Sequence, residues 1–189
     1  MVIVVDPTPH PPPAGLLTRT RTSTLAGLVL LLVPLLLGAV VGGSGLGSID
    51  PGAVPSTSAE TLLRHNLVIA ALAASGLVTF GLGTLLAMVP SWFLVGTQVG
   101  ASVLTRGADA TARGLVVHGL LELAGFVCAS AIGLLPLVHT ASRLATRHGA
   151  APSLGRRLRD AAALALGAVA LLSLAAVLET SLTPLLLTP

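Results

Sequence analysis

Glu122 is the residue of this chain whose position most strongly suggests a specific chemical role. It lies in the 25-residue segment 114–138, GLVVHGLLELAGFVCASAIGLLPLV, which is otherwise almost wholly apolar. His118 precedes it by one helical turn. A carboxylate near the middle of a membrane costs about 2.5–3.5 kcal/mol on insertion scales, so such a residue is rarely incidental. The search for a functional site therefore begins at His118 and Glu122.

Three chemical interpretations of this pair remain open. The two side chains could form a hydrogen-bonded pair that holds helices together, or a site for a proton, an ion or a substrate. A metal site is the weakest interpretation. His118 and Glu122 would supply two ligands from one helix face, a third would have to come from Glu179 or His65, and no H-E-x-x-H motif is present. We therefore expect neither a metal nor a cofactor.

The composition indicates an all-α integral membrane protein. The chain has 189 residues, of which 53% are hydrophobic and 9% charged, whereas soluble domains carry about 25% charged residues. Its basic residues are all Arg and stand at segment ends, which is typical of membrane topology and not of nucleic-acid binding. The lipid bilayer is thus an expected partner, and nucleic acid is not.

The apolar segments predict five transmembrane helices in one bundle. Residues 1–18 contain five prolines and should form a disordered tail. Residues 19–189 should form a single transmembrane domain, whose first helix we interpret as retained because no A-x-A cleavage site follows it. The third helix has only 14 residues after Pro90 and should be short or tilted, since a crossing needs about 17–25 residues. The predicted spans are 24–41, 66–89, 91–104, 114–138 and 161–182.

The positions of the Arg residues predict the topology. Segment 138–161 holds five Arg and one Asp, so it should be cytoplasmic, and Arg19 and Arg21 should lie on the same side. Both demands are met if all five helices cross. The N-terminus is then cytoplasmic and the C-terminus outside.

This topology brings several polar residues to the outer half of the bundle. His118 and Glu122 would lie there on the fourth helix, and Glu179 near the outer end of the fifth. The second helix begins at that side and the third ends there. We predict a polar network of Arg64, His65, Asn66, Arg106, His118, Glu122 and Glu179. His118, Glu122 and Glu179 are also the candidate catalytic residues.

Small residues should allow helices to approach closely around this site. His118, Glu122, Gly125, Ala129 and Gly133 follow a 4-3-4-4 spacing and share one stripe of the fourth helix. Gly96 and Gly100 form a GxxxG pattern, a weaker signal of helix packing. No G-x-S-x-G motif supports serine hydrolysis. No Walker motif is present either, so the chain cannot itself be an ATPase.

Three segments resemble the stage II sporulation protein M family of multi-pass membrane proteins. HGLLELAGF at 118–126 is similar to the family's His-Gly-x-x-Glu segment. The region 66–96 is similar to its Asn-led helix with a later Gly-x-Gly-Thr stretch, and VLETSLTP at 177–184 to its C-terminal Glu followed by Thr-Pro. Val117 replaces a usual Pro, and Ser91-Trp92 replaces a usual Asn-Gly.

The resemblance implies that His118, Glu122 and Glu179 occupy the family's signature polar positions. It also implies a bacterial plasma-membrane protein that acts without catalysis in a complex for envelope remodelling or peptide export. A membrane or ATPase partner and a hydrophobic peptide belong to that interpretation. The alternative is an intramembrane peptidase or cyclase that matures a ribosomally made peptide, with Glu122 as general base or ligand. The sequence leaves enzyme activity and homo-oligomer formation open.

Overall fold

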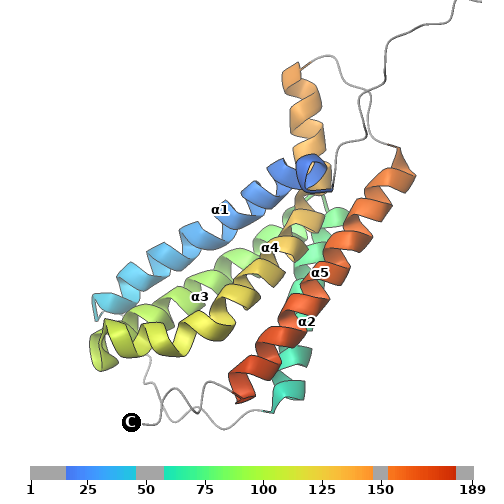
Figure 1. Cartoon of the computed structure of the whole chain (residues 1–189). Coiled ribbons are helices and arrows are strands. Elements are labelled where there is room, and N and C mark those ends of the chain that lie inside the picture. The colour runs from blue at the N-terminus through green and yellow to red at the C-terminus, as the bar shows by residue number, and fades with distance from the viewer. Residues whose placement is uncertain (1–15, 46–57, 147–152, 182–189) are drawn as a thin grey trace, which may run out of the picture.

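The computed structural model describes residues 16–45, 58–146 and 153–181, which are almost entirely helical (Figure 1). Most of the predicted tail lies outside this part of the chain, but its last residues, 16–18, already belong to the first helix. The described residues contain no strand, so the all-α prediction is confirmed. The helices are α1 Leu16–Gly43, α2 Ala59–Ala74, η1 Ser75–Leu77, α3 Leu82–Arg106, α4 Ala108–Thr146 and α5 Leu154–Ser181.

Four of these helices have the length and apolar composition needed to cross a membrane. The candidate spans are Thr18–Gly43, Leu82–Arg106, Gly119–Ala145 and Leu154–Ser181. Helix α2 has 16 residues and is not among them. The structure therefore supports a membrane protein, while the predicted count of five spans is not confirmed.

The boundary between the second and third helices lies earlier than predicted. We expected helices at 66–89 and 91–104, divided at Pro90. Instead α2 ends at Ala74 and α3 runs from Leu82 to Arg106, through Pro90. The prediction of a short third helix is therefore wrong: α3 has 25 residues, and the short helix is α2.

The backbone between α2 and α3 explains why the break falls there. Phe80 and Gly81 have φ angles of 52° and 88°, which no right-handed helix can contain. Glycine adopts this conformation at little steric cost, so Gly81 suits the turn. The Thr79 hydroxyl accepts a hydrogen bond from the Gly83 N–H at 2.9 Å. Thr84 then ties the start of α3 to the end of α2 by donating to the Ala73 carbonyl at 2.7 Å.

Pro90 does not end a helix here. A proline removes one backbone donor from the helix interior, a change that transmembrane helices tolerate where nearby hydroxyls and helices satisfy the freed groups. The Ser91 hydroxyl donates to the Ala87 carbonyl at 2.7 Å, next to this position.

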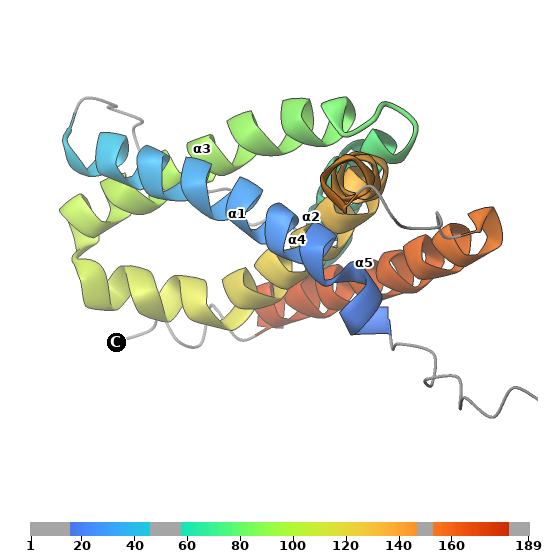
Figure 2. The ribbon, with the colours of Figure 1, turned by 90° about the horizontal axis from the view of Figure 1, so that it is seen from above.

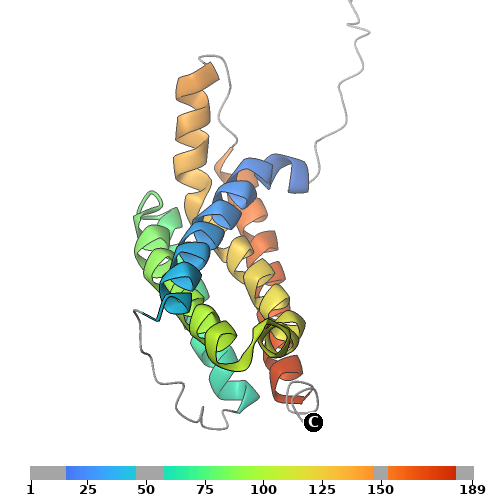
Figure 3. The same ribbon diagram turned by 90° about the vertical axis from the view of Figure 1, so that its left-hand side faces the viewer.

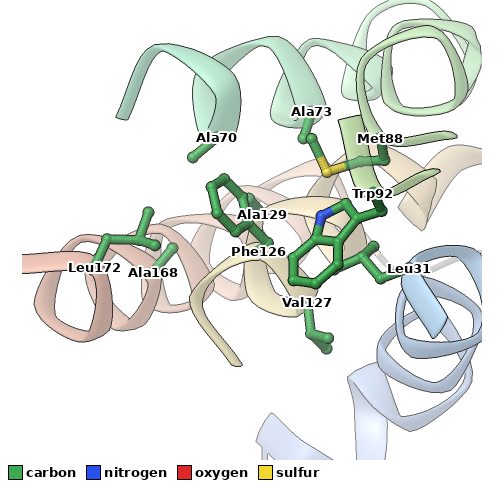
Figure 4. Packing of buried hydrophobic residues seen from close by; sticks show 10 residues of the cluster. All are labelled: Leu31, Ala70, Ala73, Met88, Trp92, Phe126, Val127, Ala129, Ala168 and Leu172. Atoms are coloured by element: carbon green, nitrogen blue, oxygen red, sulfur yellow. The ribbon is translucent and has the colours of Figure 1, made fainter. Parts of the chain in front are cut away.

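Helix α4 is central, because it packs against every other helix. Figure 2 shows its second part nearly end-on and its first part from the side, so the helix is bent; Pro136 lies inside it. Trp92 of α3 packs edge-to-face on Phe126 of α4, with ring centroids 5.9 Å apart. Figure 4 shows the surrounding core, to which all five α-helices contribute: Leu31, Ala70, Ala73, Met88, Trp92, Phe126, Val127, Ala129, Ala168 and Leu172.

Glycines let α1 and α3 lie backbone to backbone. A Cβ atom on Gly96 would collide with the Leu35 carbonyl oxygen, and one on Gly100 with that of Ala39. In the same way, Gly38 and Gly42 of α1 face backbone atoms of α3. The predicted packing role of Gly96 and Gly100 is confirmed, and the matching pair in α1 was not predicted.

Substituting Gly42 by Ala should destabilise the bundle, whereas the same change at Gly43 should not. The new Cβ at 42 would meet the Thr97 carbonyl, which moves only if α1 and α3 separate, while at 43 the nearest atom is 3.9 Å away. Overpacking of this kind costs about 1–3 kcal/mol. Thermal unfolding of the purified protein in detergent measures the difference. Equal melting of the Gly42→Ala and Gly43→Ala variants would contradict the close contact.

Candidate functional site

Glu122 is hydrogen-bonded to Asn66 across two helices. The Asn66 side-chain amide donates to the Glu122 carboxylate at 2.5 Å, which joins α2 to α4. Only 7% of Asn66 is exposed, and Glu122 is half-buried and makes a further polar interaction. Removing these groups from water is tolerable because each satisfies the other.

The same carboxylate residue lines an apolar cavity of about 200 Å³ between α1, α3 and α4. Among the described residues that line it, Glu122 is the one ionisable residue; the others are Leu35, Trp92, Val95, Val99, Leu115, Gly119, Leu120 and Leu123. Glu122 therefore takes part both in a helix–helix bond and in the wall of a space large enough for a side chain or a small ligand group.

The other predicted network residues lie at the same end of the bundle, where α2 and α4 begin and α3 and α5 end (Figure 1). Arg64, His65 and Arg106 are exposed, and Glu179 is half-buried. None of these four hydrogen-bonds or ion-pairs with another member of the predicted network in the part of the chain that the structure describes. The structure thus joins Asn66 to Glu122, and a wider network stays a prediction.

His118 lies in α4 one turn before Glu122, as expected, but its side chain falls outside the described part of the structure. Its pairing with Glu122 remains a prediction. Among the side chains that are described, no three His, Cys, Asp or Glu residues form a group that could hold a metal ion.

The predicted stripe on α4 is a packing surface. Gly125 faces Leu172 and the Ala168 carbonyl of α5. Gly133 faces the Ala73 carbonyl and the Thr84 hydroxyl, and Ala129 between them is buried. The small residues that follow Glu122 therefore bring α2, α3 and α5 against α4, as their spacing indicated.

An ion pair at the other end of the bundle was not predicted. Arg19 donates to both carboxylate oxygens of Asp160, from Nη2 at 2.7 Å and from Nε at 3.2 Å. The contact joins the start of α1 to the start of α5, 141 residues apart. Two sequence features could have indicated this ion pair: Asp160 is the single acid of the basic segment 138–161, and Arg19 was predicted to lie on the same, cytoplasmic side.

A double-mutant cycle measures the bond between Asn66 and Glu122. We expect Asn66→Ala and Glu122→Ala to be non-additive, with a coupling of about 0.6 kcal/mol, the average for hydrogen bonds between membrane helices, and at most about 1.7 kcal/mol. The readout is the free energy of unfolding in detergent or bicelles. Arg64→Ala combined with Glu122→Ala is the control and should show no coupling. A coupling of zero for the first pair would exclude a bond that contributes to stability.

Comparison with known proteins agrees with the resemblance of the three segments. The family model described as stage II sporulation protein M matches residues 27–184, which include every residue of the candidate site. No curated protein and no solved structure matches the chain. Because the matched region covers most of the sequence, the chain belongs to the stage II sporulation protein M family.

Proposed function

We propose that this protein is a non-enzymatic subunit of a membrane complex that remodels the cell envelope or exports a peptide. The observation that supports this function best is the Asn66–Glu122 hydrogen bond. It gives the membrane carboxylate a structural partner on another helix. The role is then to hold and position α2, and the energy for movement comes from a partner such as an ATPase.

Helix α2 is well placed to respond to a partner. Among the described α-helices, it is the one that is not a candidate membrane span. One side of it lines a shallow groove on the bundle surface, formed by Leu63, Arg64, Leu67, Val68 and Ala71. Force on α2 would act on α4 through the Asn66–Glu122 bond. In this proposal the polar pair couples a partner at α2 to the apolar cavity beside Glu122.

One observation favours a second candidate, an intramembrane enzyme that matures a hydrophobic peptide. Glu122 lines the apolar cavity, where one side chain of a bound peptide could lie next to the carboxylate. Glu122 would then be the general base, with His118 and Glu179 as further candidates.

Three variants separate the two functions: Glu122→Gln, Glu122→Ala and Asn66→Ala. Gln keeps an oxygen that can accept from Asn66 but carries no charge. If Glu122 couples helices, Glu122→Gln should keep most of the function, while the two Ala variants lose stability and function together. Complementation of a deletion strain measures the function of each variant, and mass spectrometry measures processing of the hydrophobic peptide. Thermal melting of each purified variant measures its stability. A Glu122→Gln protein that melts normally but no longer supports processing would favour the enzyme instead.

We further propose a bacterial plasma-membrane location with a cytoplasmic N-terminus and an external C-terminus. The Arg19–Asp160 pair supports one side for the start of α1 and the basic segment before α5, and positive charge favours the cytoplasm.

Cysteine labelling tests this orientation. In a Cys128→Ala background, Gly155→Cys should react with an impermeant maleimide only from the cytoplasmic side, because a side chain there meets open space. Ala112→Cys, at the start of α4, should react in intact cells. Labelling of position 155 in intact cells would reverse the proposed topology.

A further inference from the structure

The fold gathers most of the positive charge at one end of the molecule. We call this the Arg-rich end: the start of α1, the end of α4 and the start of α5, which lie at the upper end of the molecule in Figures 1 and 3, where α4 projects beyond the other two. Its described charged residues are six arginines and one acid: Arg19, Arg21, Arg143, Arg156, Arg157, Arg159 and Asp160. At the opposite end, Arg64, Arg106 and Arg113 are accompanied by Glu60, Asp109 and Glu179.

Asp160 does not offset the whole charge of the Arg-rich end, because its two oxygens are engaged by Arg19. Arg143, Arg156 and Arg159 are exposed at the ends of their helices. An anion that approaches these guanidinium groups can form bidentate hydrogen bonds, the geometry in which Arg binds phosphate.

Exposed leucines stand beside these arginines. In α5, Leu154 is 71% exposed, and Leu158, four residues on, is also exposed. Arg156 lies between these two leucines in the sequence, and Arg159 directly follows Leu158. Leu144 is exposed beside Arg143 in α4. A soluble anion would leave these leucines in water. A phospholipid supplies both a phosphate for the arginines and acyl chains for the leucines.

The turn between α2 and α3 indicates where the bilayer surface lies. It is at the same end, and its Val78, Phe80 and Leu82 are exposed. The chain has no Asp, Glu, Lys, Arg or His between 66 and 105, so acyl chains should cover this turn. Gly81 of the turn lies beside Leu137 of α4. Arg143 is six residues further along, about 9 Å at 1.5 Å per residue, roughly the step from hydrocarbon to headgroups.

We propose that the Arg-rich end binds the phosphate headgroups of anionic phospholipids, with Arg143, Arg156 and Arg159 as headgroup ligands. Leu144, Leu154 and Leu158 contact the upper acyl chains of the same lipids. The site is separate from Glu122 and does not depend on the function proposed above. Each juxtamembrane Arg is expected to strengthen binding to an anionic surface by about fivefold.

The test uses the full-length protein in nanodiscs of phosphatidylcholine alone or with phosphatidylglycerol. Lipid that stays bound after transfer to detergent is counted by native mass spectrometry. Wild-type protein should retain phosphatidylglycerol preferentially, and added salt should weaken the preference. Arg156→Gln with Arg159→Gln should lower it roughly 30-fold, while Arg106→Gln with Arg113→Gln, at the opposite end, should leave it unchanged.

Other results would overturn the proposal. Equal retention of the two lipids by the wild type would do so, whether or not the double variant folds. Equal losses of bound phosphatidylglycerol in the two double variants would show that the protein attracts the lipid by its overall positive charge, without a specific site at the Arg-rich end. Displacement of phosphatidylglycerol by millimolar inorganic phosphate would identify a site for free phosphate and not for a lipid.

Discussion

The bundle depends on the close approach of helix backbones. Lipid tails are as apolar as leucine, so burying leucines between helices gains little in a membrane, and association rests on van der Waals packing at small residues. Here two sets of small residues provide it. Gly38, Gly42, Gly96 and Gly100 bring α1 onto α3. On the other side of α4, Gly133 meets the Ala73 carbonyl and so holds the end of α2.

Polar contacts add links that packing alone does not supply. Arg19–Asp160 joins α1 and α5, which do not share one of the main packing interfaces of the described chain. Asn66–Glu122 joins α2 to α4 nearer the opposite end. In an apolar environment an unsatisfied polar group is costly, so each pair favours the one helix arrangement in which both members are satisfied. The small residues allow the close approach of the helices, and the polar pairs add a preference for this arrangement of α1 with α5 and of α2 with α4.

The predictable features of this chain were those written in local pattern. The scarcity of charge indicated an all-α membrane protein, and the spacing of Gly125, Ala129 and Gly133 indicated a packing stripe. Glu122 was identified because a carboxylate stands out in an apolar segment, and the topology placed Asn66 near its level. The direct bond between residues 56 apart still required the structure.

The features that were missed depend on contacts distant in sequence. Pro90 is a strong local signal for a helix end, yet helix α3 continues through it, and the turn forms instead where Phe80 and Gly81 adopt positive φ. Gly38 and Gly42 have the same GxxxG spacing as Gly96 and Gly100, a local signal that was missed, but which pair faces which still required the structure. Asp160 forms an ion pair with Arg19, 141 residues away, and no periodic pattern in the sequence predicts a pair so far apart.

Glu122 connects two features of the structure, the hydrogen bond to Asn66 and the wall of the apolar cavity. Its carboxylate holds Asn66 of α2, while its side chain forms part of a cavity wall built from α1, α3 and α4. Trp92 lines the same cavity and packs on Phe126, one turn beyond Glu122. A shift of α2 that breaks the Asn66 bond would leave the carboxylate less satisfied and favour a new rotamer, which changes the cavity wall. We therefore expect a shift of α2 to change the shape of the cavity, because both involve the Glu122 side chain.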